Sequence, residues 1–132
     1  MYKINRSNSR VDKKKILVVD DEPGIVSLLT KVLSNDYRVY KATNGQEAVD
    51  AVKKSKPDLI IMDIMMPIMD GYTACSLIRA NPETRLIPVI MLSGVDFELN
   101  KELALRMGAS DYLTKPFSLT EIVKIIESLL NA

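Results

Sequence analysis

The sequence predicts an α/β domain in which a parallel β-sheet carries helices on both faces. Short apolar runs recur along the chain, and each is followed by a segment with helical periodicity. The repeat length is close to the roughly 30 residues of a βαβ unit. Strands that are apolar throughout are typical of a sheet buried on both faces. Alternation of this kind gives parallel strands joined by right-handed crossovers.

Five segments have the character of strands. Three are continuous apolar runs, one alternates apolar and charged residues as an outer strand does, and the last is short. In chain order these segments are 15–20, 37–42, 59–62, 88–93 and 111–114. The run 59–62 is bounded by Pro57 before it and by the Pro67 and Gly71 punctuation after it, which favours a strand over a helix.

Five further segments have helical spacing. The expected inward residues are Ile25, Leu28, Leu29, Val32 and Leu33 in the first helix; Ala48, Val49 and Val52 in the second, over 46–54; Leu99, Leu103 and Met107 in the fourth, over 96–107; and Leu119, Ile122, Val123 and Ile126 in the last. The third helix is expected over 72–80, with no inward face assigned.

Local signals set the ends of these helices. Pro23 suits the first turn of a helix, and Asn44-Gly45 is a turn signal. Asn81-Pro82 stops the helix over 72–80, and Gly108 ends the one over 96–107. Ser118 is expected to cap the last helix, with Glu121 at capping-box spacing.

Composition excludes several functions. The 132 residues predict one domain, and no apolar run approaches the roughly 18 residues of a membrane span. Histidine is absent, so His-based catalysis and a phosphohistidine donor are excluded. The single Cys75 forms no internal disulfide, which favours a cytoplasmic location, and no cysteine cluster indicates zinc.

Charge is distributed unevenly along the chain. The first 15 residues carry six basic side chains and one acidic one, whereas the remainder carries a net charge of −4. A domain with that charge is not expected to bind nucleic acid directly. We therefore expect residues 1–13 to form a basic, mobile tail and residues 14–132 to form the domain.

Polar residues stand where otherwise apolar strands end. Asp20 and Asp21 follow the first strand, Asp63 the third, Ser93 the fourth and Lys115 the fifth. A strand order of 2-1-3-4-5 would bring the ends of the first and third strands together at the switch point of the sheet. Three converging carboxylates without His or Cys select a hard cation, Mg2+ or Mn2+.

The same arrangement indicates phosphoryl chemistry. Asp63 is placed to act as a nucleophile and form an acyl phosphate. Lys115 would supply a positive charge to one phosphoryl oxygen, and Ser93 would donate a hydrogen bond to another.

Each of these residues also has a purely structural interpretation. Asp63 is interpreted as a turn or cap residue, and Asp21 as the cap of the first helix. Lys115 is then a surface lysine, Ser93 a turn residue and Tyr112 a core aromatic with a hydrated hydroxyl group. Their position on one edge of one predicted sheet favours the functional interpretation.

Four motifs in order resemble those of the response-regulator receiver domain of two-component signalling. They are Val18-Val-Asp-Asp-Glu-Pro23; Met62-Asp-Ile-Met-Met-Pro67 with Asp70-Gly71; Val89-Ile-Met-Leu-Ser93; and Gly108-Ala-Ser-Asp-Tyr-Leu-Thr-Lys-Pro-Phe117. The resemblance covers about residues 14–132 and implies a flavodoxin-like, doubly wound five-stranded sheet with five helices.

The resemblance also implies a site. It places Mg2+ on Asp20, Asp21, Asp63 and the backbone carbonyl of Met65. It makes Asp63 the phosphoacceptor, with Ser93 and Tyr112 as the switch pair. It further implies a cis peptide bond between Lys115 and Pro116, which proline permits at low cost.

The resemblance implies partners as well. A sensor histidine kinase or a histidine phosphotransfer protein would donate the phosphoryl group. A downstream protein would bind the face formed by the fourth helix, fifth strand and fifth helix, and the chain would be a monomer or a phosphorylation-dependent dimer. The protein would catalyse only its own phosphorylation and dephosphorylation and so would not be an enzyme.

Two positions depart from the commonest polar residues of the family. Met65 lies two residues after Asp63, and Val95 lies two residues after Ser93; both are apolar. Since their side chains are expected to line the approach of the hydrolytic water, we expect these two residues to tune the loss of the phosphoryl group.

Three alternatives remain open. In the first, the chain is a receiver domain cut from a longer regulator that has a DNA-binding or enzymatic output. An Asp-nucleophile phosphatase of the haloacid dehalogenase type is disfavoured by Met65, where that class has Asp, and by the absence of an insertion. Flavin binding is disfavoured because the acidic run Asp20-Asp21-Glu22 would repel a phosphate.

Overall fold

The described residues form one twisted sheet of five parallel strands. The computed structural model describes residues 13–94 and 98–131. The strands are β1 (Lys15–Val19), β2 (Arg38–Ala42), β3 (Leu59–Asp63), β4 (Val89–Ser93) and β5 (Asp111–Thr114). Their order in the sheet is β2-β1-β3-β4-β5, so the predicted doubly wound, flavodoxin-like topology is confirmed.

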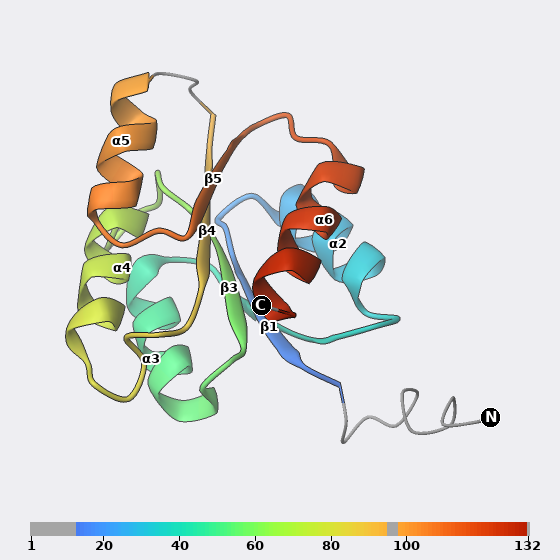
Figure 1. The fold of residues 1–132 in the computed structure, drawn as a ribbon, viewed down its shortest axis with the longest axis horizontal. Coiled ribbons are helices and arrows are strands. Elements are labelled where there is room, and N and C mark those ends of the chain that lie inside the picture. Colours follow the sequence, from blue (N-terminus) through green and yellow to red (C-terminus); the bar gives the residue numbers. More distant parts are fainter. Residues whose placement is uncertain (1–12, 95–97, 132) are drawn as a thin grey trace.

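Helices cover both faces of this sheet, as Figure 1 shows. They are α2 (Pro23–Leu33), α3 (Gly45–Ser55), α4 (Gly71–Ala80), α5 (Glu98–Arg106) and α6 (Leu119–Leu130). Helices α3, α4 and α5 lie on one face, and α2 and α6 lie on the other. Within the described ranges, no helix is long and apolar enough to cross a lipid bilayer.

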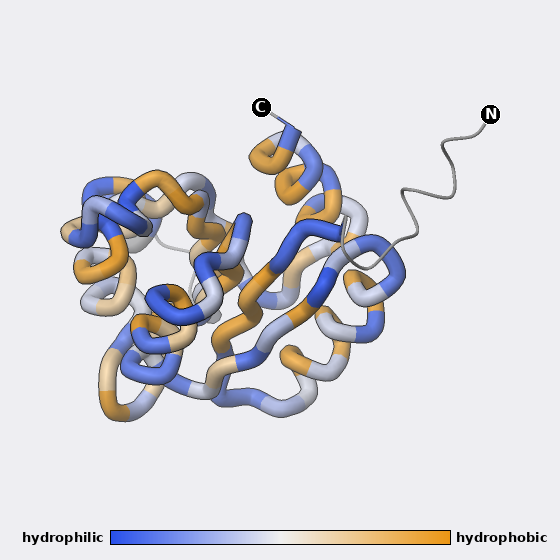
Figure 2. The backbone as a smooth tube through the Cα atoms, turned by 90° about the horizontal axis from the view of Figure 1, so that it is seen from below, coloured by the Kyte–Doolittle hydropathy of each residue, from blue (hydrophilic) through white to orange (hydrophobic). Residues whose placement is uncertain are grey.

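The strands divide the core into two layers because successive side chains point to opposite faces. In β3, Ile60 and Met62 pack toward α3, α4 and α5, whereas Leu59 and Ile61 pack toward α2 and α6. All four side chains are fully buried. Figure 2 shows hydrophobic stretches in the central strands and helices that alternate between hydrophobic and hydrophilic residues around them. The polar side chains of the sheet are therefore confined to the strand ends and to the outer strand β2.

The helix ends follow the predicted signals with one correction. Pro23 lies in the first turn of α2, α4 ends at Ala80 with Asn81 as its C-cap, and the Ser118 side chain accepts a hydrogen bond from the backbone N–H of Glu121 at 3.2 Å. Asn44, expected to form a turn, instead caps α3: its Oδ1 accepts from the backbone N–H of Glu47 at 2.9 Å. An Asn side chain serves either role, and the helix that follows decides which.

Two expectations about side chains differ from the structure. Leu28 and Leu103, placed on inward helix faces by their spacing, are 40% and 38% exposed. Each lies at the margin of an apolar stripe whose centre, Leu29 in α2 and Ala104 in α5, is buried, because a helix of this size covers only a narrow strip of sheet. The side chain of Leu99 and most of the predicted basic tail lie outside the described residues.

Two glycines allow the loop after β3 to pack closely on its neighbours. A Cβ atom on Gly71 would lie 2.4 Å from the backbone oxygen of Asp63, and one on Gly45 would lie 2.4 Å from that of Met69. The backbone N–H of Gly71 donates to Ile64 O at 2.8 Å, and that of Gly45 donates to Met69 O at 2.9 Å. The absence of a side chain at these positions thus determines the path of the loop.

We predict that Gly71→Ala lowers the free energy of unfolding by about 1–3 kcal/mol, because the new methyl group would meet backbone atoms that cannot move aside. The matched control is Gly24→Ala in the first turn of α2, where nothing lies within 4 Å of the added Cβ. That change should raise stability by up to about 1 kcal/mol, because alanine favours the helix. Denaturant unfolding of both variants measures the difference; equal stabilities would contradict it.

Candidate functional site

Three carboxylates converge at the carboxyl edge of the sheet. One oxygen atom from each of Asp20, Asp21 and Asp63 lies within 4.8 Å of the others. Asp20 and Asp21 follow β1, and Asp63 ends the neighbouring strand β3, so the strand order brings them together. Asp20 and Asp63 are buried, whereas Asp21 is exposed. The interpretation of Asp21 as a helix cap is wrong, because Glu22 occupies the cap position of α2.

The ammonium group of Lys115 lies among these carboxylates. Its Nζ is 2.9 Å from Asp20 Oδ2 and 3.5 Å from Asp63 Oδ1, and only 15% of the side chain is exposed. The backbone N–H of Lys115 donates to Ser93 O at 2.6 Å, and the peptide bond to Pro116 is cis, as predicted. Lys115 is therefore part of the site, and its interpretation as a surface lysine is wrong.

The two oxygens of Asp20 have different surroundings. Oδ1 accepts the backbone N–H of Glu22 at 2.9 Å, which fixes the turn between β1 and α2. Oδ2 is buried and, apart from its ion pair with Lys115, makes no hydrogen bond of acceptable geometry in the described part of the chain. A buried carboxylate oxygen in this condition has unused capacity for a donor or a cation.

Burial raises the pKa of Asp63 to about 6, and the nearby charges of Asp20 and Asp21 also raise it while Lys115 opposes them. Although burial favours the neutral amine, the close contacts with Glu22 and Asp20 and the negative charges of Asp63 and Asp20 raise the pKa of Lys115 above its ordinary value. Lys115 thus stays charged at neutral pH, and its single positive charge compensates only part of the negative charge of the carboxylates.

A cavity of about 370 Å³ opens onto these groups. Its walls include Asp63, Met65, Gly94 and Lys115, together with the acidic turn after β1. Met65 is 74% exposed, so its thioether side chain lies at the cavity mouth. Ser93, the last residue of β4, is 3% exposed and lies beside the end of β3. Val95 lies outside the described residues.

The loop after β3 holds a strained turn. The backbone N–H of Met69 donates to Pro67 O at 2.7 Å, and Ile68 between them has a φ of 72°, a combination that defines a γ-turn. A β-branched residue rarely adopts that φ, and such strain costs on the order of 1–3 kcal/mol. Asp70 follows and caps α4 by accepting the N–H of Thr73 at 2.7 Å.

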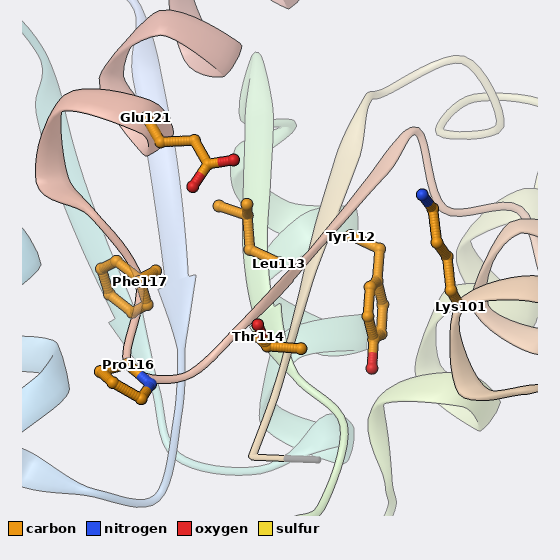
Figure 3. Close-up of a pocket in the computed structure, with 7 residues that line it drawn as sticks. All are labelled: Lys101, Tyr112, Leu113, Thr114, Pro116, Phe117 and Glu121. Atoms are coloured by element: carbon orange, nitrogen blue, oxygen red, sulfur yellow. The ribbon is translucent and has the colours of Figure 1, made fainter. Parts of the chain in front are cut away.

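Tyr112 lies on β5, the strand next to β4 and its terminal Ser93, and lines a second cavity of about 200 Å³. Figure 3 shows its ring on β5 next to Lys101 of α5, with Leu113 and Thr114 following along the strand. The ring is 8% exposed and packs in the layer beneath α3, α4 and α5. The expectation of a core aromatic therefore agrees with its burial.

Sequence reasoning missed the part that Glu22 plays. Its Oε1 lies 2.6 Å from Lys115 Nζ, the shortest of the three ion-pair distances that the lysine makes among the described residues. The available signal was its position next to Asp20-Asp21, which was interpreted only as part of an acidic run. The contact itself joins residues 93 positions apart and has no signature in either segment.

Comparison with known proteins assigns the family. The sequence model of the response regulator receiver domain matches residues 16–127. This chain belongs to the response regulator receiver domain family. Receiver domains are signalling modules that interact with histidine kinases and downstream effectors, and they bind Mg2+ at an acidic pocket.

Several relatives resemble this receiver domain closely. The alkaline phosphatase synthesis transcriptional regulatory protein PhoP of Bacillus subtilis is 43% identical over 119 residues, which are 89% of this chain and 49% of PhoP. The receiver domain of a Francisella response regulator is 33% identical, with a TM-score of 0.84 over 90% of this chain and 98% of that one. The chain spans about half the length of its PhoP relative.

A third relative carries a metal ion. The receiver domain of the sensor histidine kinase PA1611 from Pseudomonas aeruginosa is 32% identical, with a TM-score of 0.81 over 91% of this chain and 99% of that one. Its structure has a magnesium ion coordinated in the active-site cleft. In this receiver domain, Asp20, Asp21 and Asp63 form an acidic cluster whose ligand oxygens lie close enough together to hold a metal ion.

We predict that Asp63→Asn stabilises the metal-free protein more at pH 7.5 than at pH 4. A carboxyl group whose folded pKa is raised to about 6 destabilises the fold once it ionises, and this cost grows as pH rises from about 4 to above 6. The gain over the parent should differ between the two pH values by on the order of 2 kcal/mol. Denaturant unfolding without divalent ions measures it; a pH-independent gain would contradict the prediction.

Proposed function

We propose that this receiver domain accepts a phosphoryl group on Asp63 and so changes its affinity for a partner. The observation that carries the proposal is the position of the Lys115 ammonium between Asp20 and Asp63 in a cavity that opens to solvent. A nucleophilic carboxylate beside a fixed cation suits phosphoryl transfer, which depends mainly on positioning and charge stabilisation.

The residues present fit a divalent cation. The buried Oδ2 of Asp20, which has only its ion pair with Lys115, and the carboxylates of Asp21 and Asp63 provide hard oxygen ligands within one cluster. We assign Mg2+, or Mn2+ in its place, to these three residues and to the backbone carbonyl of Met65. When bound, the ion would compensate the carboxylate charges and polarise a phosphoryl oxygen.

The side chains at the site divide the work of the transfer. An oxygen of ionised Asp63 attacks the phosphorus of a phosphohistidine; the new O–P bond forms as the N–P bond breaks, and the imidazole keeps the electron pair. Lys115 then faces one oxygen of the acyl phosphate, and the hydroxyl of Ser93 donates to another. Because these 132 residues contain no histidine, the donor histidine lies outside them, on a sensor histidine kinase or a histidine phosphotransfer protein.

The signal would pass from the site to the face of α5, β5 and α6. Ser93 and Thr114 are register partners on β4 and β5, and Tyr112 lies two residues earlier on β5. We infer that Ser93 and Tyr112 form the switch pair, in which movement of the hydroxyl toward the phosphoryl group shifts the population of Tyr112 positions. The downstream partner would bind beside the Tyr112 cavity shown in Figure 3.

We also propose the wider setting of this domain. Residues 14–132 form the receiver unit, and residues 1–13 form a basic tail. The match to half of PhoP supports a regulator whose output lies in a further domain. The family match favours signalling over a phosphatase or a flavoprotein.

We predict that a small phosphodonor with Mg2+ adds one phosphoryl group, observed as a mass increase, and that Asp63→Asn abolishes it because an amide is not a comparable nucleophile. Lys115→Met should slow the reaction strongly, since the charge opposite the phosphoryl oxygens is lost.

Glu83→Gln is the matched control for this experiment. Among the described residues, Glu83 forms an ion pair only with the exposed Lys56, at 3.5 Å, and it lies in the loop after α4. The Glu83→Gln protein should therefore be phosphorylated at the rate of the parent. Full labelling of the Asp63→Asn protein would contradict the assignment of the phosphoacceptor.

We predict that Met65→Asn speeds loss of the phosphoryl group by about fivefold. The thioether at the cavity mouth cannot orient a water molecule, whereas an amide can, and one hydrogen bond of about 1 kcal/mol at the barrier corresponds to that factor. The decay of phosphorylated protein in excess Mg2+, after removal of the donor, measures the rate. Met65→Leu is the control and should decay as the parent does; equal decay of all three proteins would show that Met65 does not control the water.

A further inference from the structure

Glu22 makes the shortest ion pair of Lys115, although it is not one of the three clustered carboxylates. The Nζ–Oε1 distance is 2.6 Å, against 2.9 Å to Asp20 and 3.5 Å to Asp63. The lysine thus lies closer to a carboxylate outside the cluster than to the expected phosphoacceptor. A cation that is fully engaged by carboxylates has to give up a contact before it can bind a phosphoryl oxygen.

The position of Glu22 suits such a reversible contact. Its side chain is 60% exposed, whereas that of Asp20 is fully buried, so Glu22 can leave the lysine without disturbing the core. It occupies the cap position of α2, yet its side chain makes no capping hydrogen bond there. Its carboxylate therefore pairs with Lys115 and does not cap the helix.

The ammonium has three N–H donors and lies beside three carboxylates. A phosphoryl group on Asp63 would need one of these donors, and the exposed partner is the one most easily displaced. The contact with Glu22 is then present before phosphorylation and lost after it. Its energy adds to the barrier of the transfer.

We propose that Glu22 is a positioning residue that draws Lys115 away from Asp63 in the unphosphorylated protein and so restrains phosphorylation. The proposal rests on the function proposed above for Asp63. It concerns the rate at which the domain accepts the phosphoryl group and therefore its response to a weak donor.

A simple charge effect is the competing explanation, because Glu22 would also repel an anionic donor. Two substitutions separate the two effects. Glu22→Gln removes the charge and the ion pair together. Glu22→Asp keeps the charge but shortens the side chain by one C–C bond, about 1.5 Å, which takes the carboxylate out of contact with Lys115. Aspartate is also a preferred helix cap, so its carboxylate gains a partner in α2.

The test measures the phosphorylation rate with a small anionic donor at Mg2+ concentrations that saturate each variant. Both Glu22→Asp and Glu22→Gln should react about two- to fivefold faster than the parent, the range expected for releasing one partly exposed ion pair. Glu83→Gln, which removes an equal charge elsewhere, should match the parent. An increase in the Gln variant alone would assign the effect to charge and overturn the proposal, as would unchanged or slower rates in both.

A second measurement follows the lysine without metal or donor. The ¹⁵N resonance of the Lys115 ammonium should shift in both Glu22 variants and stay unchanged in Glu83→Gln, while circular dichroism shows that all of them are folded. Unchanged resonances in the Glu22 variants would show that Glu22 does not contact the Lys115 ammonium, and would overturn the proposal. If the parent itself is not phosphorylated, the function proposed for Asp63 fails; if the parent is phosphorylated and the Glu22 variants react no faster, only the present inference fails.

Discussion

Three carboxylates contact one ammonium group at the end of this sheet, a fourth lies in the same acidic cluster, and their mutual repulsion is the constraint on which the site depends. Asp20, Asp21, Glu22 and Asp63 carry up to four negative charges, and Lys115 compensates one of them. The repulsion is strongest where water is excluded, because Coulomb interactions strengthen as the effective dielectric constant falls. Burial accordingly shifts Asp63 toward its protonated form, and the remaining negative charge makes the site receptive to a cation.

The sheet brings the carboxylates together and also provides the stability that offsets their repulsion. Because β1 and β3 are hydrogen-bonded neighbours in parallel, the chain places carboxylates from two separate segments side by side at one edge. The apolar residues of β1 and β3 beneath the site are buried in two layers, and this burial offsets the repulsion that the Lys115 ion pairs leave uncompensated. Gly45 and Gly71 then let the loop after β3 fold down over the sheet, where larger residues would collide with backbone oxygens. Stability and reactivity thus reside in different parts of the same strands.

Most of the fold could be predicted from local patterns because the relevant forces are local. Apolar runs in strands and the spacing of Ala48, Val49 and Val52 in α3 report burial directly, and these side chains are buried. The failures occur where burial depends on how far a neighbour extends: Leu28 and Leu103 have the right spacing but lie beyond the edge of the surface they would cover. Asn44 suits either a turn or a cap, and only the helix that follows distinguishes them.

The sequence alone determined the alternation of strands and helices, the acidic strand ends and the residue types of the site, because hydrophobic periodicity and turn signals are local. The order of the strands was predicted from the resemblance to the receiver-domain family. Together they predicted that Asp20, Asp21, Asp63 and Lys115 would share one edge. Only the tertiary structure decided which carboxylate Lys115 contacts most closely. That choice depends on how a long flexible side chain reaches a residue 93 positions away in the chain, and on the short distance to Glu22, neither of which leaves a pattern in the order of residues.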